Sequence, residues 1–381
     1  RLSCQRRRSQ PDGATDLTPA PTPPRTSLGQ GHRLRRVLAT VILATAMSAC
    51  ATTKNAQQGD LDPKPAPLSL AFGSCAHQDH PQPMLDVAIA QGPDAFVYLG
   101  DNVYADTGDR ERLRATYEKL AARPEFQRLR AAMPVHATWD DHDYGLNDGG
   151  REFEHKEVSA EVFLDFWGVP EGSARRARPG VYGSAWFGSG EHRVQLLLLD
   201  TRTFRGPLTP AGDDPRYKHR YRPDPSPDAD ILGAAQWAWL EERLKEPAAL
   251  RVIATSIQFS ADYTGFESWA NLPAEQTRMV NLLGETGAHP VVFISGDVHH
   301  GELSKLTPQE GPALYDLTSS GINKVGSILE TNAARLGPAF LEQNVGMLTV
   351  DWEERTVRMV LLGTDGRTLL ERQLSLDELT P

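Results

Sequence analysis

The chain has 381 residues, of which 39% are hydrophobic and 24% are charged, and its formal net charge is −10. This is the composition of a globular protein, and it excludes a disordered, collagen-like or continuous coiled-coil chain. Three cysteines are too few for a disulfide-stabilised scaffold. The acidic balance argues against general nucleic-acid binding, so we predict no specific nucleic-acid partner.

Basic charge is concentrated at the N-terminus, where residues 1–36 hold eight arginines and two aspartates. Residues 37–49 are then uncharged and mostly apolar. This run is too short for a membrane span of about 20 residues, but it is typical of the apolar region of a signal peptide. It ends in Met47-Ser48-Ala49-Cys50, which resembles a bacterial lipobox.

We therefore interpret residues 1–49 as an upstream segment and a lipoprotein-type signal peptide, with Cys50 as the lipidated residue. Residues 50–67 are rich in Lys, Gln, Pro and Asp and read as a flexible tether. The interpretation predicts an exported, periplasmic or cell-surface lipoprotein that an N-terminal lipid anchor holds at the membrane. The alternative is an ordinary signal peptide, cut near Ala49, and a secreted protein.

From residue 68 to residue 381 the chain alternates strand-like apolar runs with helical patterns. In chain order, the predicted elements are strands at Leu68–Gly73 and Asp94–Leu99, a helix at Asp109–Leu120, a strand at Met133–Trp139, a helix at Val158–Trp167, strands at Val181–Phe187 and His192–Leu199, a helix at Ala234–Leu244, and strands at Arg251–Ser256, Pro290–Ser295, Met347–Trp352, Val357–Leu362 and Leu369–Leu374. Residues Gly206–Asp230, rich in Pro, Asp and Arg, are predicted to form a long surface insertion. The alternation indicates an α/β fold with mixed sheets.

Four of the predicted strands end in polar clusters. These clusters are Ser74-Cys75, Gly100-Asp101, Asp140–Asp143 and Asp297–His300. Functional groups of α/β sheets gather at the carboxyl ends of the strands, so we expect the four clusters to meet on one edge of a sheet. His300 is adjacent to His299 and is expected to point the other way.

The residue types in these clusters suit metal ions. Taken singly, an aspartate after a strand often caps a turn and a buried cysteine often behaves as a small hydrophobe. Together, the carboxylates and imidazoles suit first-row metals, and carboxylates also suit calcium or magnesium. Asp297 and His299 alternate and so can face one side, while Asp101 could bridge two ions. Two metals about 3.5–4 Å apart form a clamp for displacement at phosphorus.

The order of these motifs carries a resemblance to a known family. The motifs are Gly73-Ser74-Cys75, Gly100-Asp101-Asn102-Val103-Tyr104, Trp139-Asp140-Asp141-His142-Asp143, Leu199-Asp200-Thr201-Arg202, Leu232-Gly233 with Gln236 and Trp239-Leu240, and Gly296-Asp297-Val298-His299. They resemble the alkaline phosphatase D family, the PhoD-like metallophosphatases, over roughly residues 68–363. The resemblance implies a calcineurin-like metallophosphoesterase fold, a sandwich of two mixed β-sheets flanked by helices.

The resemblance also implies a dinuclear or multinuclear metal site. Its Fe(III) ligands would be Cys75, Asp101, Tyr104 and His299, with Asp101 as the bridge. Its second metal, which the resemblance suggests is Ca2+, would be held by Asp141, Asp297 and, in an uncertain register, Asn147.

The remaining roles implied by the resemblance are catalytic. His142 would protonate the leaving oxygen, with Asp143 orienting it. Arg202 would be either a phosphate-binding residue or a structural residue at the sheet edge.

These assignments predict a metal-dependent phosphoesterase in which a metal-bound hydroxide or oxide attacks phosphorus. Small phosphate monoesters and diesters, including phospholipid head groups, are the expected partners. Two alternatives are a phospholipase-D-like phosphodiesterase on the same scaffold and a surface lipoprotein that binds metal or phosphate without turnover.

Overall fold

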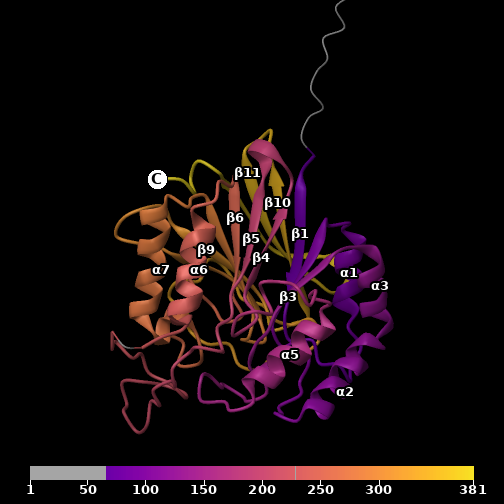
Figure 1. Ribbon diagram of the computed structural model, residues 1–381. Coiled ribbons are helices and arrows are strands. Elements are labelled where there is room, and N and C mark those ends of the chain that lie inside the picture. Colours follow the sequence, from indigo (N-terminus) through magenta and orange to yellow (C-terminus); the bar gives the residue numbers. More distant parts are fainter. Residues whose placement is uncertain (1–65, 228) are drawn as a thin grey trace, which may run out of the picture. The chain divides into compact units, whose positions relative to one another are not determined.

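The computed structural model describes residues 66–227 and 229–381, and two six-stranded β-sheets form its centre (Figure 1). The strands are β1 (Leu68–Gly73), β2 (Ala95–Leu99), β3 (Val135–Thr138), β4 (Gly183–Phe187), β5 (Val194–Leu198), β6 (Leu250–Ala254), β7 (Val291–Ser295), β8 (Gly301–Leu306), β9 (Leu314–Ser319), β10 (Asn344–Asp351), β11 (Thr356–Gly363) and β12 (Thr368–Ser375). The predicted signal segment, Cys50 and nearly all of the tether lie outside the described residues.

Both sheets are mixed. The first has the order β12-β11-β10-β1-β2-β3, in which β1, β2 and β3 are parallel and the three C-terminal strands are antiparallel. The second has the order β4-β5-β6-β7-β9-β8, with β5, β6, β7 and β9 parallel and an antiparallel strand at each edge. The first sheet thus joins the two ends of the described chain, and the second is built from its middle.

The helices cover the outer faces of the two sheets. They are α1 (Pro83–Ala90), α2 (Arg110–Ala121), α3 (Pro124–Ala132), α4 (Asp141–Tyr144), α5 (Lys156–Phe166), α6 (Gly233–Leu244) and α7 (Pro273–Thr286), with 3-10 turns at Gly190–His192, Trp269–Asn271 and Thr364–Gly366. α1, α2, α3 and α5 pack on the first sheet, and α6 and α7 on the second (Figure 1).

Alternating strand residues build three apolar layers. In β2, Val97 and Leu99 face the other sheet, while Phe96 and Tyr98 face the helices. β6 divides its side chains in the same way. Strands buried on both faces read as continuous apolar runs, and this explains why these segments were recognisable in the sequence.

The predicted fold class is confirmed, since the chain forms a sandwich of two mixed sheets flanked by helices. Every predicted strand and helix is present, with ends that differ by a few residues. The described part of the insertion at residues 206–230 contains no named helix or strand. Four helices (α1, α3, α4 and α7) and two strands (β8 and β9) were not predicted. Among the described residues, no helix is both long and apolar enough to cross a membrane.

The contact between β1 and β10 gives a stability test. Gly346 lies opposite Phe72, and a Cβ at Gly346 would be 2.3 Å from the Phe72 ring. We expect Gly346→Ala to lower the free energy of unfolding by about 1–3 kcal/mol, because the buried ring must move. Gly284→Ala, at an exposed position of α7 with open space around it, should instead raise that free energy by up to about 1 kcal/mol.

Urea unfolding of the two variants measures both effects. Equal free energies of unfolding for Gly346→Ala and the unchanged protein would contradict the tight contact between the two strands.

Candidate metal and active site

The polar clusters at the strand ends meet, but not on one edge of one sheet. Cys75, Asp101 and the segment Asp140–Asp143 follow the parallel strands β1, β2 and β3 of the first sheet. Asp297 and His299 follow β7 of the second sheet. The site therefore lies where the carboxyl ends of two packed sheets come together, which corrects the single-edge expectation.

Backbone conformation sets the direction of the donor side chains. Nine non-glycine residues of the described chain have positive φ, and six of them lie in this site. These six are Cys75, Asp101, Asp106, Asp148, Asp297 and His299, with φ between 46° and 71°. Such left-handed conformations cost free energy, and they concentrate at functional sites where the surrounding structure fixes them.

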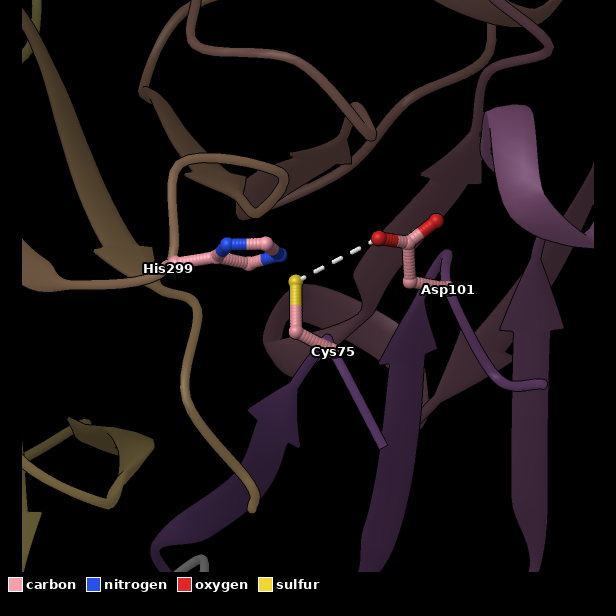
Figure 2. A group of neighbouring side chains, drawn as sticks. All are labelled: Cys75, Asp101 and His299. Atoms are coloured by element: carbon pink, nitrogen blue, oxygen red, sulfur yellow. Dashed lines mark hydrogen bonds between the residues drawn. The ribbon is translucent and has the colours of Figure 1, made fainter. Parts of the chain in front are cut away.

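A first donor group combines a thiol, a carboxylate, a phenol and an imidazole. Figure 2 shows Cys75, Asp101 and His299 converging from three separate loops. The Cys75 sulfur lies 3.5 Å from Asp101 Oδ2. The Tyr104 hydroxyl donates to the same Asp101 oxygen at 3.0 Å and lies 3.3 Å from His299 Nε2. All four predicted iron ligands are thus neighbours.

The thiol of Cys75 is prepared for ionisation. Burial alone would raise the pKa of this thiol. The charge of His299 and hydrogen bonds from His299, Ser320 and Ser74 outweigh burial and lower the pKa to about 6. The Ser320 hydroxyl lies 3.1 Å from the sulfur. A thiolate is the form of cysteine that binds metals, so Cys75 suits a cation at neutral pH.

A second donor group consists of carboxylates. Asp140, Asp141 and Asp297 each place a ligand atom within 4.8 Å of the others, and Asp101 joins Asp141 and His142 in an adjacent group. Burial, followed by the charges of neighbouring acids, raises the pKa of Asp297 and Asp101 well above its usual range. Asp101 thus belongs to the first group and to a group that shares Asp141 with the second, which is the position of a bridging ligand.

Two observations indicate that these residues can hold metal ions. One oxygen of Asp101 and one of Asp141 are buried without a hydrogen-bond donor in the described chain. A cation would satisfy both oxygens and keep the clustered carboxylates ionised. The mixed sulfur, nitrogen and oxygen donors of the first group suit a transition metal, whereas the all-oxygen second group suits a hard cation.

The donor groups open into a cavity of about 340 Å3. Its lining residues include Asp101, Asp141, His142, Asn147, Asp148, Arg220, Tyr221, Glu267, Asp297, His299, His300, Glu302, Ile328 and Arg335. Asn147 is exposed at the cavity wall. His300 lines the same cavity as His299, which corrects the expectation that it points away, because the backbone here is left-handed and not a pleated strand.

The surface insertion reaches this cavity. Arg220 and the Tyr221 hydroxyl both donate to Asp148 Oδ2 at 2.6 Å. Asp148 in turn donates its backbone amide to Asp141 and shares a donor group with Asp141 and Glu267. The insertion thus forms one wall of the site.

His142 is oriented by Asp106, and the expected orienting role of Asp143 is wrong. His142 Nδ1 lies 2.7 Å from Asp106 Oδ1. The carboxylate of Asp143 accepts instead from the backbone amides of Asp140, Asn102 and Val103 and from the Tyr117 hydroxyl. Asp143 therefore fixes the loop after β2 against α4.

Of the two roles expected for Arg202, its contacts favour the structural one and not the binding of phosphate. Its side chain has no exposed surface. Its Nε donates to Asp140 at 2.5 Å, and its Nη1 pairs with Glu267 at 2.7 Å. Arg202 therefore offsets the charge of Asp140 and Glu267, which both belong to the donor groups.

Three participating residues were not found from the sequence. Asp106 and Asp148 carried a signal only as acids close to the recognised motifs, and nothing in the spacing distinguished them from solvated loop residues. Glu267 lies in a loop without a motif, and only the packed structure brings it to Arg202 and Asp141.

The family model and the curated protein that match this chain both describe phosphatases. The model of the PhoD-like phosphatase family matches residues 70–334. Alkaline phosphatase D of Bacillus subtilis (strain 168) is 23% identical over an alignment of 291 residues, and the match covers 63% of this chain and 47% of that protein. The chain thus spans about half the length of this curated relative.

Two solved structures share the fold. One described as "Structure of PhoD" covers 82% of this chain and 72% of its own, with a TM-score of 0.64 and 17% identity. "GAP50 the anchor in the inner membrane complex of Plasmodium" covers 81% of this chain and 89% of its own, with a TM-score of 0.51 and 11% identity. At these identities, the two structures show a shared fold.

The buried ion pairs of Arg202 can be tested by stability. We expect Arg202→Met to lower the free energy of unfolding by about 3–5 kcal/mol, because Asp140 and Glu267 would stay buried without their partner. Arg114→Met, which removes an exposed pair with Asp165 on the helix surface, should change it by less than about 1 kcal/mol.

Denaturant unfolding of the metal-free variants measures the difference. If Arg202→Met kept full stability and only raised KM, a direct role in substrate binding would replace the structural one.

Proposed function

Because the chain belongs to the PhoD-like phosphatase family, we propose that it is a metal-dependent phosphoesterase acting on phosphomonoesters, phosphodiesters or both. The observation that carries this proposal is Asp101, whose carboxylate belongs to two adjacent donor groups that open into one cavity. A pair of sites joined in this way is the arrangement that two-metal enzymes use to stabilise in-line displacement at phosphorus.

The donor chemistry supports a specific pair of ions. Cys75, Asp101, Tyr104 and His299 would hold Fe(III). Asp101, Asp141, Asp297 and Asn147 would hold a hard cation, for which the family resemblance suggests Ca2+. When bound, such a pair supplies Lewis-acid stabilisation of the phosphoryl oxygens and lowers the pKa of a water nucleophile.

The chain itself supplies the proton for the leaving group. His142 borders the cavity beside Asp141, and its Nδ1 is engaged by Asp106, which leaves Nε2 for proton transfer. Burial opposes the charged ring, but the hydrogen bond to Asp106 and the nearby acids outweigh it and raise the pKa of His142. A histidine held in this way serves as a general acid.

The cellular setting is part of the proposal. The arginine-rich start, the apolar run at residues 37–49 and Cys50 support export and anchoring by lipid. An enzyme held at a membrane surface would meet phospholipid head groups as well as small phosphate esters. A phospholipase-D-like preference would appear as faster hydrolysis of diesters that carry acyl chains.

Metal content tests the site directly. We expect the chain from Ala51 onward to purify with near-stoichiometric iron and a broad visible absorption band from thiolate and phenolate ligation. Cys75→Ser should shift or abolish that band, because the thiolate is removed, while the fold persists. A colourless protein that cannot be loaded with iron would contradict the proposed ligand set and would favour a binding lipoprotein without turnover.

Turnover tests the proton donor. We expect His142→Ala to lower kcat by roughly 10²–10⁴ with unchanged metal content. Asp106→Asn should lower kcat by a smaller factor, because the ring stays but loses its orientation. His192→Ala, whose ring packs on Trp352 outside this cavity, should leave kcat unchanged.

Initial rates with phenyl phosphate, whose phenoxide leaving group gains from protonation, together with metal analysis of each variant, measure these effects. Full activity in His142→Ala would remove its role as the acid.

A further inference from the structure

The segment Ser320–Gly326 is fixed against the first donor group. The backbone amides of Asn323 and Lys324 both donate to the carbonyl of Cys75, at 3.3 and 3.1 Å. The amide of Gly326 donates to the carbonyl of His299 at 2.8 Å. Ser320 Oγ accepts from the His299 amide at 2.7 Å. The segment therefore holds a constant position relative to Cys75 and His299.

Asn323 ties a second loop to this segment. Its Oδ1 accepts from the His77 amide at 2.7 Å, and its Nδ2 donates to the carbonyl oxygens of His77, His80 and Pro81 at 2.9 to 3.3 Å. The His77 ring stacks on Tyr104, with ring centroids 5.0 Å apart. His77 is thus held beside the same phenol that reaches Asp101.

Lys324 brings a cation to this point. Its Nζ lies 4.2 Å from the ring centroid of Tyr104. The hydroxyl of that ring contacts Asp101 and His299, so the ammonium group lies against the ring of a member of the first donor group. Within residues 66–227 and 229–381, the lysines that form ion pairs with carboxylates lie elsewhere, and Lys324 is not among them. Its side chain is half-buried and retains a route to solvent.

The two arginines of the cavity are already engaged. Arg220 pairs with Asp148, and Arg335 pairs with Glu302. Lys324 therefore differs from these arginines. It lies next to the donor groups, and no carboxylate of the described residues forms an ion pair with it. An anionic substrate that approaches a chain of net charge −10 and a cluster of buried carboxylates needs such a local positive charge.

We propose that Lys324, supported by His77, binds a phosphoryl oxygen of the substrate and gives the site a preference for dianionic phosphomonoesters over monoanionic diesters. The inference rests on the proposed phosphoesterase function and deepens it. The ammonium group would form a charge-assisted hydrogen bond to the second negative oxygen, which a diester lacks. Inorganic phosphate, the product of monoester hydrolysis, would bind at the same position.

The test uses the metal-loaded protein and two kinds of readout. Calorimetry gives the Kd for inorganic phosphate, and steady-state kinetics give kcat and KM for p-nitrophenyl phosphate and bis(p-nitrophenyl) phosphate. We expect Lys324→Met to raise the phosphate Kd and the monoester KM by about tenfold. The diester KM and the metal content should stay close to those of the unchanged protein.

Two further variants make the comparison specific. Lys324→Arg keeps the charge and should retain most of the phosphate affinity. Lys305→Met is a matched control, because Lys305 also lies over a tyrosine ring, 5.6 Å from the centroid of Tyr315, and borders a different surface pocket. It should change neither the phosphate Kd nor KM.

The outcomes separate the two proposals. An unchanged phosphate Kd in Lys324→Met, an equal rise in KM for both esters, or a loss of metal from that variant would overturn the anion-binding role. If the unchanged protein binds phosphate through Lys324 but hydrolyses neither ester, the anion site stands and the phosphoesterase function is wrong. If it hydrolyses the esters but binds no phosphate, the anion-binding role is wrong and the phosphoesterase function stands.

Discussion

The mutual repulsion of buried carboxylates is the constraint on which the rest of this structure depends. Asp101, Asp140, Asp141 and Glu267 are almost fully buried within one region, and the half-buried Asp297 lies beside them. Taking ionised groups out of water is costly unless opposite charge compensates them. The protein meets part of this requirement with its own arginines, on the side of the cluster away from the cavity.

This division of charge gives the site two sides with different chemistry. Arg202 is fully buried and pairs with Asp140 and Glu267, so the protein itself offsets the charge of these two acids, although Glu267 also borders the cavity. Asp101 and Asp141 keep oxygens that no donor satisfies in the described chain, and they border the cavity. The open side is where exchangeable cations complete the balance, and Arg202 limits how many of them are needed.

The sequence predicted the parts of this arrangement that depend on local order. Buried strands appear as apolar runs, and the polar residues that follow them are readable without a structure. Among the Pro-initiated helices, α3 and α7 were not predicted because their apolar positions are sparse. α1 was not predicted because a mostly apolar run of eight residues is too short to show a helical period. β8 and β9 were not predicted because they contain polar residues, such as Glu302 and Asp316. The hydrogen-bond partners of these residues come from distant parts of the folded chain.

The sequence could not show which side chains from distant segments contact one another, and the reason is physical. Which carboxylate orients His142 depends on the conformation of the loop after β2, where Asp106 has a φ of 46°. Asp143, one residue away in the chain, points into the protein and accepts backbone amides. The position of Arg202 is a similar case, since its two acidic partners, Asp140 and Glu267, each lie more than sixty residues away in the chain.

The loop between Asp101 and Asp106 shows how the two halves of the proposed chemistry are coupled. It supplies the carboxylate of Asp101 that two donor groups share, the phenol of Tyr104 and the carboxylate of Asp106 that contacts His142. Asp143 holds the start of this loop through two backbone amides, and the amide of Asp106 donates to the carbonyl of His142. The ring of His142 also packs against Tyr104, with centroids 4.2 Å apart. A displacement of this loop would therefore disturb the metal ligands and the proton donor together, so the acid is positioned by the same segment that positions the metals.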